Sequence, residues 1–592
     1  MYRSKAIKKL IFLLKDSSFR ILLEHLKKED RPKINKNIDF IEWIHEDLVL
    51  AVKLFTEEQG LLKSRFVRCS NMIFRTEKFS ILLQRWLVDY LGDLFNLIYD
   101  YEHSCLKGKY SLPLEDNPLN RFAIKRYESK FGVKIPVPWK PALGNIRKAL
   151  SIFLQNLFII YHSVKTGVVL FAKKETYKVM HESLWGLFSM HGYYFHDDFF
   201  VDGKVIMSDD LLLFSRAEIH HCSQSMKAMN QARGSSYASF YLPDLPISLI
   251  DLLLRVLPRY IFFESFVFIS EIRSKNFSLF QSIFYYFSIY GLPYEKVFSN
   301  FNINAELGHG YFIAQHIPEA IVCNNRGAKY YLIHWSDNSV DLDKHILSFL
   351  GCDRFFLWGP SHVQGVEGNP EMLEFTGYFF KKFIKDIKIN RKNVLKDMQI
   401  SARGKVISFF DESFGANCIM TGMHYVNFWK LALESARLMS DHTIVIKPKG
   451  LYEYRNLPNN LIADFLEVKD ELSRRDNVFF VDDERWSFVE CIGISDLVIT
   501  QGMTSSATIA IICGINGLYF AEAEVDHIFS RHFKDKLVFD SAVSILKMIR
   551  RIVDGDENPL HLITENIMRG LDAYKDDSGL DNLKRILSGV NS

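Results

Sequence analysis

Residues 496–520, DLVITQGMTSSATIAIICGINGLYF, contain the pattern that decides the fold. An apolar run at 496–500 precedes a turn that holds one glycine and three hydroxyl side chains. An apolar helix is then expected at 505–513, and a second apolar run follows at 517–520. Apolar strands and helices in this order are typical of a parallel sheet that is covered on both faces. The stretch therefore predicts one β-α-β unit of an α/β domain.

The same alternation continues toward the N-terminus of this stretch. We expect strands at 405–410, 443–447 and 478–481, separated by helices at 425–439, 461–475 and 488–493. Five buried strands that alternate with helices predict a Rossmann-like sheet. Two more helices are expected beyond it, at 542–553 and 561–587.

A second α/β domain is expected earlier in the chain. The chain has 592 residues, and a single core rarely grows beyond about 250–300 residues. Short apolar runs that predict strands occur at 168–171, 261–268, 320–323, 330–334 and 354–358. Residues 1–160 show helical periodicity, and the charged, glycine-poor segment 381–403 predicts a domain boundary. We therefore expect a helical N-terminal extension (1–160), two Rossmann-like domains (161–390 and 391–555) and a C-terminal helical tail (556–592).

Composition excludes several classes of protein. With 73 Lys and Arg against 70 Asp and Glu, the net charge of +3 is too small for a surface that binds nucleic acid throughout. The eight cysteines form no CxxC pair, which predicts reduced thiols in a cytoplasmic protein. No uncharged apolar run reaches 18 residues, so no membrane span is expected. The aromatic-rich stretch 242–294 favours packed core, with a surface for peripheral contact with the inner membrane as the alternative.

Polar side chains follow each expected strand of the second domain, and ligands of parallel α/β sheets bind at that edge. The candidates are Asp411, Glu412, Lys447, Lys449, Gly502, Thr504, Ser505, Ser506, Glu522 and Glu524. Gly502 permits close backbone approach, and the hydroxyls begin a helix, which predicts a phosphate site. The alternative is an ordinary helix cap and solvated lysines at a strand end. Asp411 and Glu412 fit a general base equally as well as a loop-stabilising turn.

Three short motifs resemble those of a known enzyme class. The runs DESFG at 411–415, IKPK at 446–449 and TSS at 504–506 resemble the ordered acidic, HP and Ser/Thr motifs of bacterial sialyl- and Kdo-type transferases. Those are GT-B glycosyltransferases that use CMP-activated sugars. Residues 496–520 are also similar to GT-B transferases of capsule and other surface polysaccharides. The resemblance covers about residues 300–550, and Lys447 replaces the histidine of the HP motif.

The resemblance implies a GT-B-like fold with two Rossmann-like domains facing a cleft. It implies a nucleotide-sugar donor, a CMP-linked ulosonic acid such as Kdo or sialic acid, and a glycan or lipid-linked glycan acceptor. Lys447, Lys449, Ser505 and Ser506 would hold the phosphate without a metal or other cofactor. Asp411 or Glu412 would be the base, and Glu522 or Glu524 would bind the ribose.

Acceptor-side candidates lie in the first half of the chain. The motifs at 327–334 and 352–359 resemble the strands that close the acceptor domain of those families, although His334 is followed by Trp335 where a glycine is usual. His196 and Glu218 are further candidates there. Histidines at 191–196 and 220–221 lack metal-ligand spacing, so no metal is assigned. The rival interpretations are a UDP-sugar transferase, a sugar-nucleotide epimerase, a CDP-glycerol-type transferase and a catalytically inert assembly protein.

Overall fold

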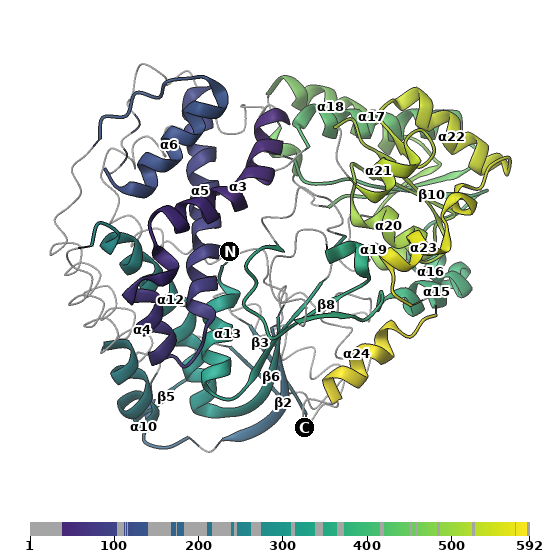
Figure 1. Ribbon diagram of the computed structural model, residues 1–592. Coiled ribbons are helices and arrows are strands. Elements are labelled where there is room, and N and C mark those ends of the chain that lie inside the picture. Colours follow the sequence, from purple (N-terminus) through teal and green to yellow (C-terminus); the bar gives the residue numbers. More distant parts are fainter. Residues whose placement is uncertain are drawn as a thin grey trace.

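Two parallel β-sheets, each flanked by helices, organise the chain (Figure 1). The structure is a computed structural model, and it describes residues 38–103, 112, 114, 116–139, 167–172, 174–182, 210–215, 238–241, 245–261, 274–308, 314–334, 336–337, 347–363, 372–414, 420–449, 453–457, 459–481, 486–523, 527–574 and 576–588.

The first sheet has the strand order β4-β3-β2-β6-β7-β8-β9 in the described part of the chain, and every neighbouring pair is parallel. The first strand of the sheet in chain order, β2, is therefore internal. The next two strands, β3 and β4, lie on one side of it, and β6 to β9 lie on the other. The strands are β2 (Glu175–Glu182), β3 (Leu211–Ser215), β4 (Ala238–Tyr241), β6 (Phe301–Gly308), β7 (Lys329–Ile333), β8 (Arg354–Leu357) and β9 (Leu373–Phe375).

Alternate residues of this sheet face two different cores, as the pleat of a strand requires. Tyr330 and Leu332 of β7 pack with the preceding helices, whereas Tyr331 and Ile333 pack with residues that lead to the second sheet. The N-terminal helices therefore share one continuous core with the first sheet. These helices are α3 (Ile38–Glu58), α4 (Arg65–Ile73), α5 (Lys78–Glu102), α6 (Pro118–Phe131), α12 (Phe277–Asn300) and α13 (His316–Asn325).

The second sheet has the strand order β12-β11-β10-β13-β14-β15 among the described residues, again all parallel. In chain order this is 3-2-1-4-5-6, the order of a Rossmann fold. Its strands are β10 (Val406–Phe410), β11 (Thr443–Lys447), β12 (Val478–Phe480), β13 (Leu497–Gln501), β14 (Asn516–Phe520) and β15 (Val538–Phe539). The helices between them are α17 (Gly422–Leu438), α18 (Asn459–Ser473), α19 (Phe488–Gly493), α20 (Ser505–Ile512), α21 (Ile528–Phe533) and α22 (Ala542–Asp554).

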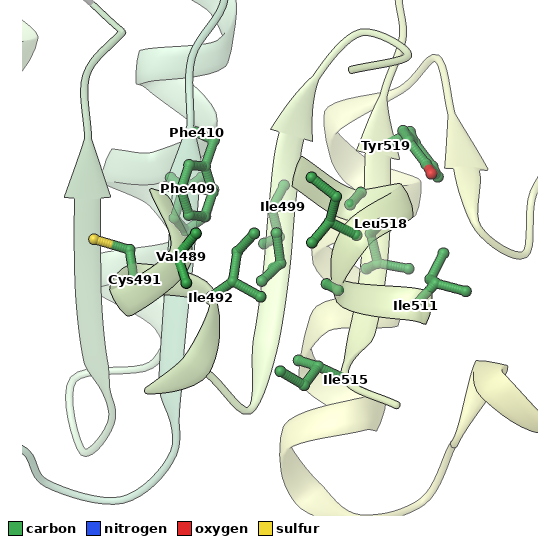
Figure 2. Packing of buried hydrophobic residues seen from close by; sticks show 14 of the residues in the cluster. Phe409, Phe410, Val489, Cys491, Ile492, Ile499, Ile511, Ile515, Leu518 and Tyr519 are labelled. Atoms are coloured by element: carbon green, nitrogen blue, oxygen red, sulfur yellow. The ribbon is translucent and has the colours of Figure 1, made fainter. Parts of the chain in front are cut away.

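Apolar side chains of α19 and α20 cover one face of this sheet. Figure 2 shows Val489 and Ile492 of α19 beside Phe409 of β10, and Ile511 of α20 beside Leu518 of β14. These residues are almost fully buried, and each large aliphatic side chain contributes about 1.5–3 kcal/mol on burial. The same packing fixes the start of α20 beside the end of β13.

The expected Rossmann-like order is confirmed, whereas several strand and helix assignments differ from the structure. The run 320–323 belongs to helix α13, because a short apolar run fits a buried helix as well as a strand. Ile261 lies in a helical segment that starts at α10 (Leu249–Asp251) and continues through η5 (Leu252–Val256). Residues 262–268 lie outside the described residues. Strand β15 was not predicted, because it is only two residues long.

The C-terminal segment was predicted as one helix at 561–587 and is instead divided. It forms η10 (Pro559–Leu562), α23 (Glu565–Leu571) and α24 (Gly579–Ser588). This segment returns to the first sheet: a Cβ atom at Gly359 would overlap the backbone carbonyl of Gly570, and buried Lys381 pairs with Asp572 at 2.8 Å. The segment 381–403, expected as a boundary, forms α15 (Lys381–Ile389) and α16 (Arg391–Asp397).

Across the described residues, no helix is both long enough and apolar enough to cross a bilayer.

Candidate functional site

The carboxyl ends of β10 and β13 are neighbours at the point where the second sheet reverses its strand order. Asp411 follows β10 and accepts a hydrogen bond from the backbone amide of Lys449 at 2.6 Å. This bond ties the loop after β11 to the end of β10. Lys447 itself is the last residue of β11, in register with Phe410. The strand reversal is the place where doubly wound sheets bind their ligands.

Glu412 lies between the lysine loop and β13. Its side chain forms an ion pair with the Nζ of Lys449, and its backbone amide donates to Gln501 Oε1 at 3.1 Å. The structure therefore brings Asp411, Glu412 and Lys449 together, as their positions after successive strands predict. Lys449 is half exposed, so its ammonium group remains accessible to an incoming anion.

Asp411 is an unusual carboxyl group because it is 6% exposed at the end of a buried strand. Burial raises the pKa of Asp411 to about 6, although the Lys449 amide and the Tyr425 and Trp429 side chains favour the ionised form. The folded protein consequently binds a proton more tightly here than the unfolded chain does. Stability from this group is greatest at low pH and is lost as the pH rises through about 6.

We expect Asp411→Asn to remove this pH dependence. Because Asn keeps an acceptor for the Lys449 amide, the stability of the variant relative to wild type should rise by about 1.5 kcal/mol between pH 5 and pH 7.5. Urea unfolding at the two pH values measures this difference. The exposed Asp476→Asn variant is the control, because Asp476 pairs with an arginine and not with a histidine, and it should change with pH as wild type does. If the difference in unfolding free energy between Asp411→Asn and wild type is the same at pH 5 and pH 7.5, the raised pKa of Asp411 is contradicted.

The turn after β13 contains a glycine in the left-handed region and a buried amide donor. Gly502 has a φ of 63°, and a Cβ atom there would overlap the Met420 methyl group. The Nε2 group of Gln501 has no hydrogen-bond partner among the described residues, although Gln501 is 1% exposed. A buried amide donor without a partner is costly, so a ligand acceptor at this turn would be stabilised.

The hydroxyl groups of the turn take different positions. Thr504 is the N-cap residue of α20 but its side chain makes no capping hydrogen bond, and Ser506 is partly buried in the first turn. The Ser505 hydroxyl lies 2.8 Å from that of Ser336 and accepts from the Asp337 amide at 2.9 Å. Ser505 thus contacts the loop that follows β7 of the first sheet. The carboxyl edges of the two sheets consequently meet at this residue.

Asp337 is the centre of a buried cluster between the two sheets. Its Oδ2 accepts from the Thr508 hydroxyl of α20 and lies 3.4 Å from His527 Nε2, while its Oδ1 lies 3.5 Å from His362 Nδ1. The Phe529 amide donates to His527 Nδ1, so the neutral ring carries its proton on Nε2 and donates to Asp337.

His334 and His362 are buried beside this aspartate, with ring centroids 4.9 Å apart. Burial lowers the pKa of His334 well below its ordinary value, and the neighbouring His362 lowers it further. Burial also lowers the pKa of His362, against the effect of Asp337. Because the Leu571 carbonyl at 3.1 Å only accepts, His362 carries a proton on Nε2. Both rings are therefore neutral at pH 7 and supply no positive charge.

The remaining predicted residues are placed as follows. Glu522 follows β14 and accepts from Asn427 at 2.8 Å; its second oxygen has no partner among the described residues, and burial raises the pKa of the group. Glu524, His196 and Glu218 lie outside the described residues. In the described part of the chain, no group of three or more His, Cys, Asp or Glu side chains has the geometry to hold a metal ion.

Sequence reasoning missed four residues of this region: Thr508, Asp337, His362 and His527. The signal was present, because Asp337 follows β7, His362 follows β8 and His527 follows β14. Applying the rule of strand ends to the first sheet as well as to the second would have found Asp337 and His362.

No family model matches the sequence, and no curated protein matches it. The structure is similar to that of the wall teichoic acid polymerase TagF, with a TM-score of 0.42, 8% identity, and coverage of 75% of this chain and 97% of that one. It is also similar to a putative UDP-N-acetylglucosamine 2-epimerase from Listeria monocytogenes (TM-score 0.39, 10% identity, 71% and 96% covered). A third neighbour is α,α-trehalose 6-phosphate synthase from Burkholderia multivorans (TM-score 0.39, 8% identity, 70% and 98% covered).

The strand orders and the contacts at Ser505 and Asp337 define the class of fold. Two doubly wound domains with facing carboxyl edges form a GT-B-like fold, which confirms the expected fold class.

Proposed function

We propose that this chain is a glycosyltransferase that transfers a sugar from a nucleotide-activated donor to a surface glycan or its lipid-linked precursor. The proposal rests on the residues at the carboxyl edge of the second sheet. There, an accessible lysine, an acidic residue and the Gln501 amide donor, which has no partner among the described residues, lie around a glycine turn at a helix N-terminus. The lysine, the amide donor and the helix N-terminus are groups that bind a nucleotide phosphate. The acidic residue can accept the proton that the acceptor hydroxyl loses during transfer.

Lysines are the source of positive charge in this proposal. His334 and His362 are neutral, so the phosphate of the leaving nucleotide binds Lys449 and Lys447 together with the first amides of α20. Gln501 Nε2 donates to the same group or to the base. Glu522 offers its unpartnered oxygen to a ribose hydroxyl.

The ion pair between Lys449 and Glu412 couples binding to chemistry. An arriving phosphate competes with Glu412 for the ammonium group, and a phosphate carries the greater charge. Once Lys449 turns to the phosphate, the Glu412 carboxylate is released from its cationic partner. Glu412 then accepts the proton of the acceptor hydroxyl. Asp411, which is buried behind it, positions the lysine loop through the Lys449 amide.

The donor in this proposal is a CMP-linked ulosonic acid, as the three sequence motifs imply. A panel of sugar-nucleotide donors, with hydrolysis or transfer as the readout, tests both the transferase activity and the CMP-linked donor. We expect turnover of CMP-linked sugars and little with UDP-sugars or CDP-glycerol, with EDTA having no effect. Turnover of UDP-sugars or CDP-glycerol alone would contradict the CMP assignment and retain a transferase. If no donor is consumed and no nucleotide raises the melting temperature, the chain is an inert member of the fold.

A further inference from the structure

Exposed apolar side chains gather at a corner of the first domain that the proposed reaction does not use. Strand β1 (Val168–Val169) pairs there with β5 (Ile247–Ser248), in a parallel two-stranded sheet. Leu170 and Phe171 directly follow β1 and are 62% and 70% exposed. The helical segment 249–261 directly follows β5, so both lie at the same corner.

That helical segment is apolar on two faces. Leu252, Val256 and Tyr260 recur every four residues and are buried against the core. On the other side, Ile250, Leu253, Leu254 and Ile261 are exposed, with Leu254 reaching 73%. The solvent face of a surface helix is normally polar, whereas this one is leucine-rich. We call Leu170, Phe171, Ile250, Leu253, Leu254 and Ile261 the apolar corner.

Basic residues flank the apolar corner. Helix α4 lies next to the segment, because the ring of Phe74 at its C-terminal end packs against Tyr260 at 5.9 Å. Four exposed cations lie on or beside α4, and none forms an ion pair with a described acidic residue: Lys63, Arg65, Arg68 and Arg75. The nearest buried carboxylate of the segment, Asp251, is already neutralised by Arg255 at 2.8 Å and Arg326 at 3.1 Å.

We propose that the apolar corner and the basic face of α4 dock this protein onto the surface of an anionic lipid bilayer. Apolar side chains enter the boundary between headgroups and acyl chains, and the cations attract anionic headgroups. The basic residues are the reason to choose a lipid surface over a second copy of the chain, whose own corner carries the same charge. In Figure 1, α4, β5 and α10 lie along one flank, whereas the helices of the second sheet lie at the opposite corner. Docking through this flank therefore leaves the second domain free of the bilayer.

Sedimentation with lipid vesicles tests the proposal on the full chain. We expect wild type to pellet with vesicles containing about 30% phosphatidylglycerol and much less with pure phosphatidylcholine. The triple variant Phe171→Ser, Leu253→Gln, Leu254→Gln should bind about tenfold or more weakly. Arg65→Gln with Arg68→Gln should weaken binding and reduce its sensitivity to salt.

A matched control uses apolar residues of comparable exposure elsewhere. Ile389, Leu438 and Val543 are 80%, 55% and 63% exposed, on α15, α17 and α22. Changing these three to Gln should leave vesicle binding unchanged. Thermal melting checks that every variant folds, and Leu254→Gln alone serves if the triple variant does not.

Three results would overturn the proposal. The first is wild type that stays in the supernatant with both vesicle types. The second is equal binding by wild type and the apolar-corner variant. The third is wild type that dimerises in sedimentation velocity without binding vesicles, with a monomeric apolar-corner variant, which would assign the corner to a second copy.

Discussion

Asp337→Ala is expected to destabilise the protein by about 2–4 kcal/mol and to loosen the contact between the two sheets. The substitution removes one buried acceptor from the Thr508 hydroxyl and from His527 Nε2, and each such loss costs about 1–3 kcal/mol. Thr508 keeps a partial alternative in the Tyr519 hydroxyl at 2.8 Å, which limits the upper end of the range. Urea unfolding measures the loss, and small-angle scattering measures the separation of the domains.

Asp572→Asn is the matched control for this experiment. Asp572 is equally buried and also links distant segments, through Lys381 at 2.8 Å and the Tyr378 amide at 3.0 Å. Its bonds go to Lys381 and Tyr378 and not to the helix that begins at Ser505, so Asp572→Asn should lower stability while leaving nucleotide affinity unchanged. Asp337→Ala should lower both. Wild-type stability and compactness in Asp337→Ala would remove Asp337 from the contact between the sheets.

Glu412→Gln is expected to lower kcat by about 10²–10⁴, the usual contribution of a positioned general base. Donor affinity should stay the same or increase slightly, because Lys449 loses its competing carboxylate partner. The change should therefore appear in kcat and not in the donor KM. Steady-state kinetics with the donor that the panel identifies separates the two parameters.

Glu471→Gln is the control for the base. Glu471 is also a partly exposed glutamate in an ion pair, with Arg437, but it lies on α18. Its loss should leave kcat unchanged. Wild-type turnover in Glu412→Gln would move the base elsewhere, with the neutral His334 and His362 as the next candidates.

Much of the second sheet follows from its sequence, because each buried strand there is a separate apolar run bounded by polar turns. The positions of Asp411, Glu412 and Lys449 at strand ends were predictable for the same reason, and the structure joins Lys449 to both carboxylates. Prediction was weaker in the first half, where apolar runs such as 320–323 fit helix and strand equally.

Contacts between the two domains could not be predicted from local sequence patterns. The sequence around Ser505 predicts a phosphate ligand or a helix cap. It does not indicate that the partners of Ser505 are Ser336 and Asp337, more than 160 residues earlier in the chain. Likewise, the neutral state of His334 depends on burial by residues that are distant in sequence.

Calorimetric titration with CMP tests the central claim most directly, because the claim is that Lys449 at the edge of the second sheet binds a nucleotide phosphate. Wild type should bind CMP, and Lys449→Ala should bind it more weakly by about 1.5–3 kcal/mol, the range of a charge-assisted hydrogen bond. Lys430→Ala is the control, since Lys430 is 48% exposed and ion-paired with Asp464, much as Lys449 is 50% exposed and paired with Glu412. It should bind CMP as wild type does. Equal affinity in a folded Lys449→Ala protein, or no binding of any nucleotide by wild type, would contradict the account.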